Sequence, residues 1–128
     1  MAYKRKTTQK TVSQVEYFFN NCFRPKTLYK VIIGQTPFVK VAISNGDTEQ
    51  CFLRDRRKFL KRFSLINVEK WKEDYLNKNV LDGYQWGLKV TYNDGTQKIS
   101  GGSNAYPKEF GRLKKLFNDI TLQEPLST

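Results

Sequence analysis

The chain has 128 residues, with 23 lysines and arginines against 12 aspartates and glutamates, and its formal net charge is +11. This length fits one domain, and a surface so positive attracts polyanions such as nucleic acid before any specific contact forms. No histidine is present, so the chain lacks the usual general base near neutral pH and the commonest metal ligand. The composition therefore favours a binding protein over an enzyme, with no catalytic residue, metal or cofactor expected.

The N-terminal part is predicted to be a flexible tail followed by strands. Residues 1–11 carry four cations and no acid, which is typical of a mobile basic tail. The alternation from Val15 predicts a first strand, with Val15 and Tyr17 on the face opposite Glu16. Two more strands are expected over 29–33 and 38–44, and Asn45-Gly46 predicts a hairpin into a return strand over 48–53.

Two helical stretches are predicted next. Asp55 precedes apolar residues that recur at helical spacing, among them Phe59 and Phe63. A further helical stretch is predicted over 68–76, where Trp71 and Tyr75 lie four residues apart.

The C-terminal part carries the clearest strand pattern. An apolar stripe of period two predicts a strand with one face against the helices; its residues are Trp86, Leu88, Val90 and Tyr92. Asn93-Asp94-Gly95 predicts a tight turn into a strand over 96–100, and 101–106 is expected to be a loop. Pro107 suits the first position of a last helix that ends near Ile120. One domain is therefore expected over 12–120, with a frayed tail over 121–128.

These elements predict an α+β fold, in which a mainly antiparallel sheet of β-hairpins has two or three helices packed on one face. The segment 39–46 resembles 88–95, and each is followed by a short strand and a helix. This similarity indicates either a degenerate hairpin-plus-helix repeat or a chance likeness between two amphipathic hairpins.

The candidate binding residues are basic. Residues 54–62 hold six cations and one acid, and on a helical wheel most of these cations lie opposite Phe59 and Phe63. Such a face can neutralise several phosphates, although a solvated helix face has the same pattern. The last helix adds a second basic arc, which forms either one platform with the first or a separate patch. The predicted binding residues are Arg54, Arg57, Lys58, Lys61, Arg62, Lys108, Arg112 and Lys115.

Other chemistry has weaker support. Tyr3, Tyr29, Tyr84 and Tyr106 are candidates to stack on unpaired bases, but tyrosines in a small domain are more often core edges or turn locks. Residues 101–103 lack the spacing of a phosphate-binding loop and are better explained as a turn. No acid has a lysine two residues after it, which argues against a metal-dependent nuclease. Cys22 and Cys51 are expected to be buried thiols in a reducing cytosol, since no second pair suggests a disulfide framework or zinc site.

One resemblance goes beyond composition. The runs Val80–Leu88, Asn93–Gly95 and Gly102–Pro107 resemble a pattern in small proteins of low-GC Gram-positive bacteria and their mobile elements, whose function is unknown. The resemblance spans about residues 67–118 and includes Trp71. It implies a fold element and a broad origin, but no activity and no site residues.

Together these features predict a small non-enzymatic protein of the bacterial cytoplasm that binds nucleic acid or a nucleoprotein. The sharper hypothesis is a phage or mobile-element protein that inhibits a host defence nuclease, such as a CRISPR effector, as anti-CRISPR proteins do. The alternatives are a module whose basic face binds an acidic protein surface and an assembly protein that self-associates. No membrane partner is expected, because no apolar run approaches the roughly 18–20 residues of a membrane span.

Overall fold

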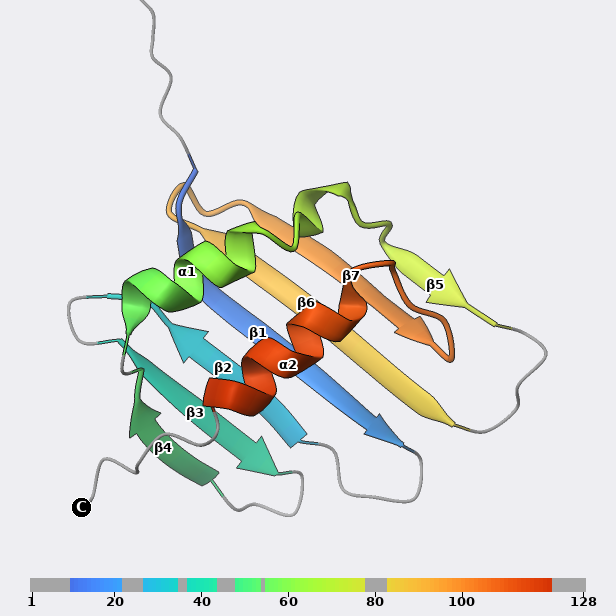
Figure 1. The fold of residues 1–128 in the computed structure, drawn as a ribbon, viewed down its shortest axis with the longest axis horizontal. Coiled ribbons are helices and arrows are strands. Elements are labelled where there is room, and N and C mark those ends of the chain that lie inside the picture. The colour runs from blue at the N-terminus through green and yellow to red at the C-terminus, as the bar shows by residue number, and fades with distance from the viewer. Residues whose placement is uncertain are drawn as a thin grey trace, which may run out of the picture.

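The computed structural model describes residues 10–21, 27–34, 37–43, 48–53, 55–77 and 83–120. Figure 1 shows these residues as one sheet with helices across it. The elements in chain order are β1 (Val12–Asn21), β2 (Thr27–Ile32), β3 (Phe38–Ile43), β4 (Thr48–Phe52), α1 (Arg56–Ser64), the 3-10 helix η1 (Val68–Lys70), β5 (Asp74–Leu76), β6 (Tyr84–Tyr92), β7 (Gln97–Ser103) and α2 (Phe110–Ile120). The predicted α+β class is confirmed.

The sheet has seven strands in the order β4-β3-β2-β1-β6-β7-β5. Every neighbouring pair is antiparallel except β5 and β7, which run parallel, so the sheet is mixed but mostly antiparallel. The long strands β1 and β6 pair at the centre and join the two parts of the chain. The strands β4 and β5 form the two edges.

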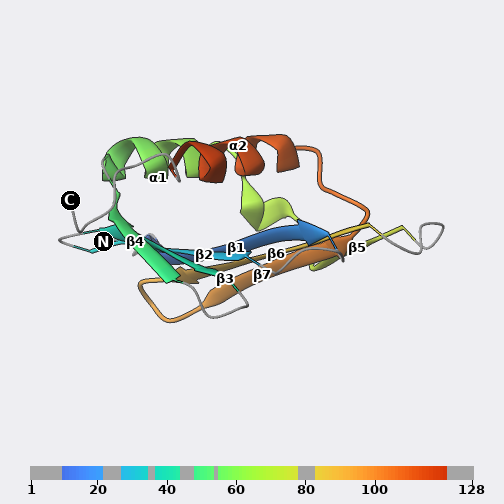
Figure 2. The same ribbon diagram turned by 90° about the horizontal axis from the view of Figure 1, so that it is seen from below.

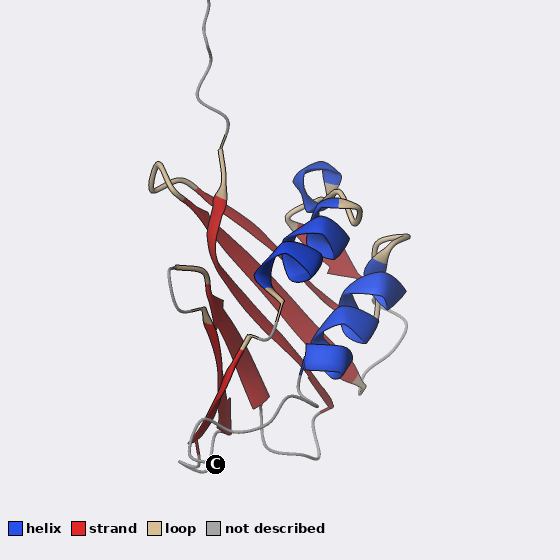
Figure 3. Ribbon diagram, turned by 60° about the vertical axis from the view of Figure 1, so that its left-hand side comes forward, coloured by secondary structure: helices blue, strands red, loops and turns tan. Residues whose placement is uncertain are grey.

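The helices lie on one face of this sheet, which we call the covered face (Figures 2 and 3). No described helix lies over the opposite face, which we call the bare face. The alternation of β1 and β6 explains this arrangement, because Val15, Tyr17, Leu88 and Val90 are buried while Glu16 and Lys89 are more exposed. The predicted orientation of the Trp86–Tyr92 stripe toward the helices is confirmed.

Aromatic contacts hold the two layers together. Phe110 of α2 packs on Trp86 with ring centroids 4.8 Å apart, and Phe117 stacks on Tyr17 at 4.6 Å. Phe59 of α1 meets Phe117 edge-on at 6.2 Å, so both helices share one core. The described helices are all too short or too polar to cross a membrane.

The helix predicted over 68–76 is wrong. The backbone leaves the helical region after the single turn of η1, since Trp71 has φ −73° and ψ 148°. Tyr75 lies instead in β5, where Asp74–Leu76 pair with Gly101–Ser103. Pairing with the distant strand β7 overrides the local helical spacing of this segment. A local sequence pattern contains no information about such a partner.

The loop predicted over 101–106 begins later than expected. Gly101, Gly102 and Ser103 belong to β7 and pair with both β6 and β5, so they form neither a turn nor a phosphate-binding loop. A Cβ on Gly102 would lie 2.7 Å from the Trp86 Nε1 and 2.7 Å from the Tyr75 carbonyl oxygen. Glycine at this position therefore allows three segments to approach closely.

The predicted turn at Asn93-Asp94-Gly95 is confirmed. The Gly95 N–H donates to the Tyr92 carbonyl at 3.0 Å, and Gly95 has φ +88°, which favours glycine. Asp94 Oδ1 accepts hydrogen bonds from the Thr96 N–H and hydroxyl. Both hairpins, β3–β4 and β6–β7, are followed by a helix, but their origin in a repeat stays a prediction.

Several predictions fall on residues outside those described. They are most of the basic tail, Tyr3, Cys22, the Asn45-Gly46 turn, Arg54 and the C-terminal tail over 121–128. The backbone of Cys51 lies in β4, but its side chain is also outside the described part.

Candidate functional site

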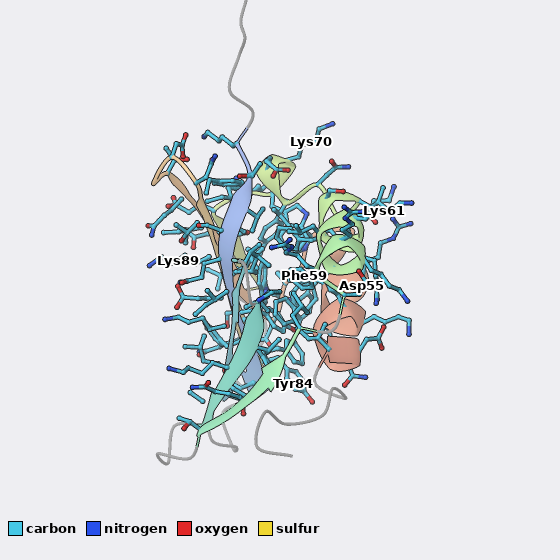
Figure 4. All side chains as sticks on the ribbon, turned by 90° about the vertical axis from the view of Figure 1, so that its left-hand side faces the viewer. Asp55, Phe59, Lys61, Lys70, Tyr84 and Lys89 are labelled. Carbon is cyan, nitrogen blue, oxygen red and sulfur yellow. The ribbon has the colours of Figure 1, made fainter. Side chains whose placement is uncertain are left out.

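The basic helix α1 begins at a well-formed cap. The Asp55 carboxylate accepts a hydrogen bond from the Lys58 N–H at 3.0 Å, as an N-cap aspartate does. Phe59 and Phe63 are buried against the core, so the polar residues between them turn outward. Figure 4 shows Phe59 between α1 and the sheet, with Lys61 pointing away from both.

The cations of α1 differ in their partners. Arg57, Lys58 and Lys61 are exposed and form no ion pair with a described residue. The Arg56 guanidinium donates to the Gly34 carbonyl, which ties the first turn of α1 to the end of β2. Arg62 is half-buried and faces α2.

Helix α2 carries the second set of cations. Its apolar stripe is buried, which leaves Lys108, Arg112, Lys114 and Lys115 exposed on α2 and the turn before it. Arg112 pairs with Glu109 at 3.0 Å, whereas Lys108 has no ion-pair partner among the described residues.

Asp119 links the two helices. Its carboxylate lies 2.9 Å from the Arg62 guanidinium on α1 and 3.7 Å from the Lys115 ammonium on α2. The sequence left open whether the two basic arcs form one platform or separate patches. Because one carboxylate contacts a cation from each helix, at least these parts of the two arcs adjoin.

We call this outer surface the basic helical layer, and its charge is strongly one-sided. Residues 55–64 and 108–120 hold nine cations and three acids. The cations of the layer are Arg56, Arg57, Lys58, Lys61, Arg62, Lys108, Arg112, Lys114 and Lys115. Asp55 caps α1, and Glu109 and Asp119 each pair with arginine, so the three acids leave most of the cations unneutralised. Seven of the eight predicted binding residues lie in this layer, and Arg54 lies outside the described part.

An aromatic groove lies along α2, and we call it the α2 groove. Its volume is about 540 Å³. Its aromatic lining is Tyr17, Phe19, Tyr29 and Phe117, and Lys114 and Lys115 also line it. The Lys114 ammonium lies 4.2 Å from the centroid of the Phe19 ring, within cation–π distance. Sequence reasoning missed Lys114, because its aromatic partner comes from the first strand.

The structure separates the tyrosines that were candidates for stacking. Tyr29 lines the α2 groove and stacks on Tyr17 with centroids 6.1 Å apart. Tyr84 stacks on Phe19 at 5.0 Å, and Tyr106 packs on Phe110 at 4.9 Å, and both tyrosines remain exposed outside the α2 groove. Burial raises the pKa of Tyr29, so its phenol is neutral at physiological pH.

The bare face has different chemistry. A hollow of about 590 Å³ lies over Gly87 and Gly101, and its lining includes Glu16, Glu73, Asp74 and one lysine, Lys89. Lys89 is 4.0 Å from Glu16. Figure 4 places Lys89 on the side of the sheet opposite Lys61. Within the described residues, no group of three or more acids and cysteines is placed to hold a metal ion.

A comparison of the chain with protein-family models, with curated proteins and with solved structures finds no match. The resemblance of residues 67–118 to small proteins of Gram-positive mobile elements therefore stays a prediction. Several residues of that pattern form hydrogen bonds within the fold. Asn104 Oδ1 accepts from the Tyr84 N–H at 2.9 Å, and the Trp86 indole donates to the Ala105 carbonyl at 2.9 Å.

Proposed function

We propose that this protein is a non-enzymatic binding protein that holds nucleic acid, free or within a nucleoprotein, on the basic helical layer. The observation that carries the proposal is the adjoining of α1 and α2 through Asp119, since it brings cations distant in the sequence onto neighbouring helices. Several phosphates can then be neutralised at once, which is the main source of affinity in nucleic-acid binding.

The distribution of partners supports the same proposal. Arg57, Lys58 and Lys61 are exposed and have no carboxylate partner among the described residues. Exposed cations that no carboxylate neutralises are available to the phosphates of a polyanion. An acidic protein surface offers similar charge, so the test must separate the two.

The experiment measures binding of a fluorescent oligonucleotide at several salt concentrations. Each phosphate that the protein neutralises contributes about −0.7 to −0.9 to the slope of log K against log salt. In the triple variant R57Q/K58Q/K61Q we expect weaker binding and a slope that is flatter by about two to three units. The fold should survive, because these side chains are exposed and point away from Phe59 and Phe63.

The matched control removes the same charge from the bare face. Lys40 pairs with Lys30, and Lys30 and Lys89 each pair with Glu16, so the three lysines lie in one row on that face. The variant K30Q/K40Q/K89Q should bind nearly as tightly as the unmodified protein. Equal losses of affinity in the two triple variants would show that net charge alone explains the weaker binding. No binding of the unmodified protein to DNA or RNA at low salt would contradict the proposal and favour an acidic protein partner.

The sharper form of the proposal is that the bound nucleoprotein is a host defence nuclease, such as a CRISPR effector, which the protein inhibits. Its support is the small size, the high charge and the resemblance to mobile-element proteins. A cleavage assay with a purified effector tests this form. Inhibition by the unmodified protein that the triple α1 variant loses would support it, whereas undiminished cleavage at saturating protein would contradict it.

A further inference from the structure

The α2 groove combines a cluster of aromatic side chains with two lysines. Its volume of about 540 Å³ is within the usual range of small-molecule sites. Four aromatic side chains line it, and Lys114 and Lys115 stand among them. Aromatic rings beside cations suit a ligand that is itself a flat ring attached to an anion.

The rings form a compact cluster around Tyr17. Phe117 and Tyr29 both stack on Tyr17, with interplanar angles of 26° and 19°, and their own ring centroids lie 5.9 Å apart. Tyr17 is only 3% exposed, whereas Tyr29 and Phe19 are half-buried. The outer rings are therefore supported from behind by the core and remain partly accessible, which limits the entropy lost when a further ring stacks on them.

The groove is continuous with the basic helical layer. Lys115 lines the groove and also lies 3.7 Å from Asp119, the residue that joins α2 to Arg62. A strand whose phosphates follow the layer therefore passes the rim of the groove. The hollow on the bare face offers no such path, because three of its lining residues are acids that repel phosphate.

We propose that the α2 groove accepts an unpaired nucleobase, so that the nucleic acid bound by this protein is single-stranded. The base stacks on the Tyr29 side of the groove, and Lys114 and Lys115 contact its flanking phosphates. The inference rests on the proposed function, since it assigns the class of nucleic acid held by the same surface. Stacking against an aromatic side chain is tolerant of sequence, so a single-stranded ligand of mixed sequence should bind.

The test compares two single-stranded oligonucleotides of equal length and charge. One is oligothymidylate, and the other has the same backbone with abasic positions. We expect the unmodified protein to bind oligothymidylate about tenfold more tightly. In Y29L this preference should fall to nearly onefold, while the salt dependence of both oligonucleotides persists. In K114Q both oligonucleotides should bind more weakly by a similar factor, because phosphate contacts are common to them.

The matched control is F18L, which removes a half-buried aromatic ring from the bare face. The preference of F18L for oligothymidylate should equal that of the unmodified protein. If F18L loses this preference, the bases stack on the bare face and the inference is overturned. Equal affinity of the unmodified protein for both oligonucleotides, with normal salt dependence, would overturn the inference but leave the proposed function standing. Tighter binding of duplex than of oligothymidylate would do the same. No binding to any oligonucleotide would overturn both.

A second measurement does not depend on whether Y29L folds. A single 2-aminopurine flanked by abasic positions loses fluorescence when it stacks on an aromatic ring. We expect its fluorescence to fall when the unmodified protein is added to saturation. Unchanged fluorescence at saturating binding would overturn the inference.

Discussion

The two faces of the sheet are made from the same strands but differ in what lies above them. On the covered face, β1 and β6 bury Val15, Tyr17, Leu88 and Val90 under α1 and α2, and the outer surface of those helices is basic. On the bare face, Lys30, Lys40 and Lys89 lie in one row with Glu16, and Glu73 and Asp74 line the hollow on the same face, so cations and acids are balanced there. A strongly basic chain has therefore not spread its charge evenly, and the helices hold a local excess of cations. The largest excess of positive charge among the described residues therefore lies on the outer surface of the helices.

The largest expected loss of stability comes from comparing two neighbouring residues of β6, one on each face of the sheet. Leu88 is 2% exposed on the covered face, and Leu88→Ala should lower the free energy of unfolding by about 2–5 kcal/mol. Lys89 points to the bare face, and Lys89→Ala should change it by less than about 0.5 kcal/mol. Urea denaturation of the two variants measures both. A similar cost at the two positions would mean that the bare face is as tightly packed as the covered one.

The turn between β6 and β7 determines which residues face the core, and it gives the next effect. A slip of one residue in the register would exchange the two faces of a strand. Gly95 has φ +88°, and a Cβ added there would meet no atom within 4 Å, so Gly95→Ala tests backbone strain alone. We expect a loss of about 1–2 kcal/mol in the free energy of unfolding.

Gly34 supplies the control for that prediction. A Cβ at Gly34 would also meet no atom within 4 Å, but Gly34 does not have a positive φ. Gly34→Ala should therefore leave the thermal unfolding midpoint nearly unchanged. If both alanine variants unfold at the same temperature, the positive φ of Gly95 is not what stabilises the turn.

The sequence predicted best where the signal was local. The stripe from Trp86 to Tyr92 and the turn at Gly95 depend on residues that are adjacent in the chain, and both have the expected structure. The segment with Trp71 and Tyr75 was predicted wrongly, because its strand partner is β7, far along the chain. Helical spacing in a short segment does not reveal a partner that competes for its backbone hydrogen bonds.

The candidate site shows the same division. Local periodicity placed Lys61 and its neighbours on the outer face of α1, which the burial of Phe59 and Phe63 supports. The adjoining of α1 and α2 depends on how both helices pack on the sheet, and no spacing within either helix contains that information. The α2 groove was missed for the same reason, since Phe19 and Tyr29 come from strands and Lys114 from the last helix.

A smaller loss of stability is expected where η1 contacts β6. The Tyr92 hydroxyl donates to Glu69 Oε2 at 2.9 Å, which ties η1 to β6. Tyr92→Phe should lower the free energy of unfolding by about 1 kcal/mol near neutral pH, because it removes this hydrogen bond. Urea denaturation at pH 8 measures the loss, and an unchanged stability would mean that the tie contributes nothing.

The same contact predicts a pH dependence. Burial, and then the hydrogen bond and charge of Glu69, raise the pKa of Tyr92 to about 12 from an ordinary value of 10. The stability contributed by the neutral phenol is thus fully present below pH 10 and is lost as the pH rises from 10 to 12. The difference in stability between the unmodified protein and Tyr92→Phe should therefore shrink over that range. A constant difference from about pH 8 to about pH 11.5 would contradict this account.

The smallest expected change in stability sharpens the comparison most directly, because it alters the charge of the basic helical layer without removing a cation. Asp119 is partly exposed, so the loss of its two ion pairs in Asp119→Asn should cost less than about 1 kcal/mol. Arg62 and Lys115 would then lack a carboxylate partner among the described residues, and we expect tighter binding of oligonucleotides and a salt slope steeper by about one unit. Glu16→Gln changes the net charge equally on the bare face and should leave the slope unchanged. Equal gains in the two variants would show that net charge alone governs binding. A loss of binding in Asp119→Asn would mean that the bridge between α1 and α2 positions the cations, and that its geometry outweighs its charge.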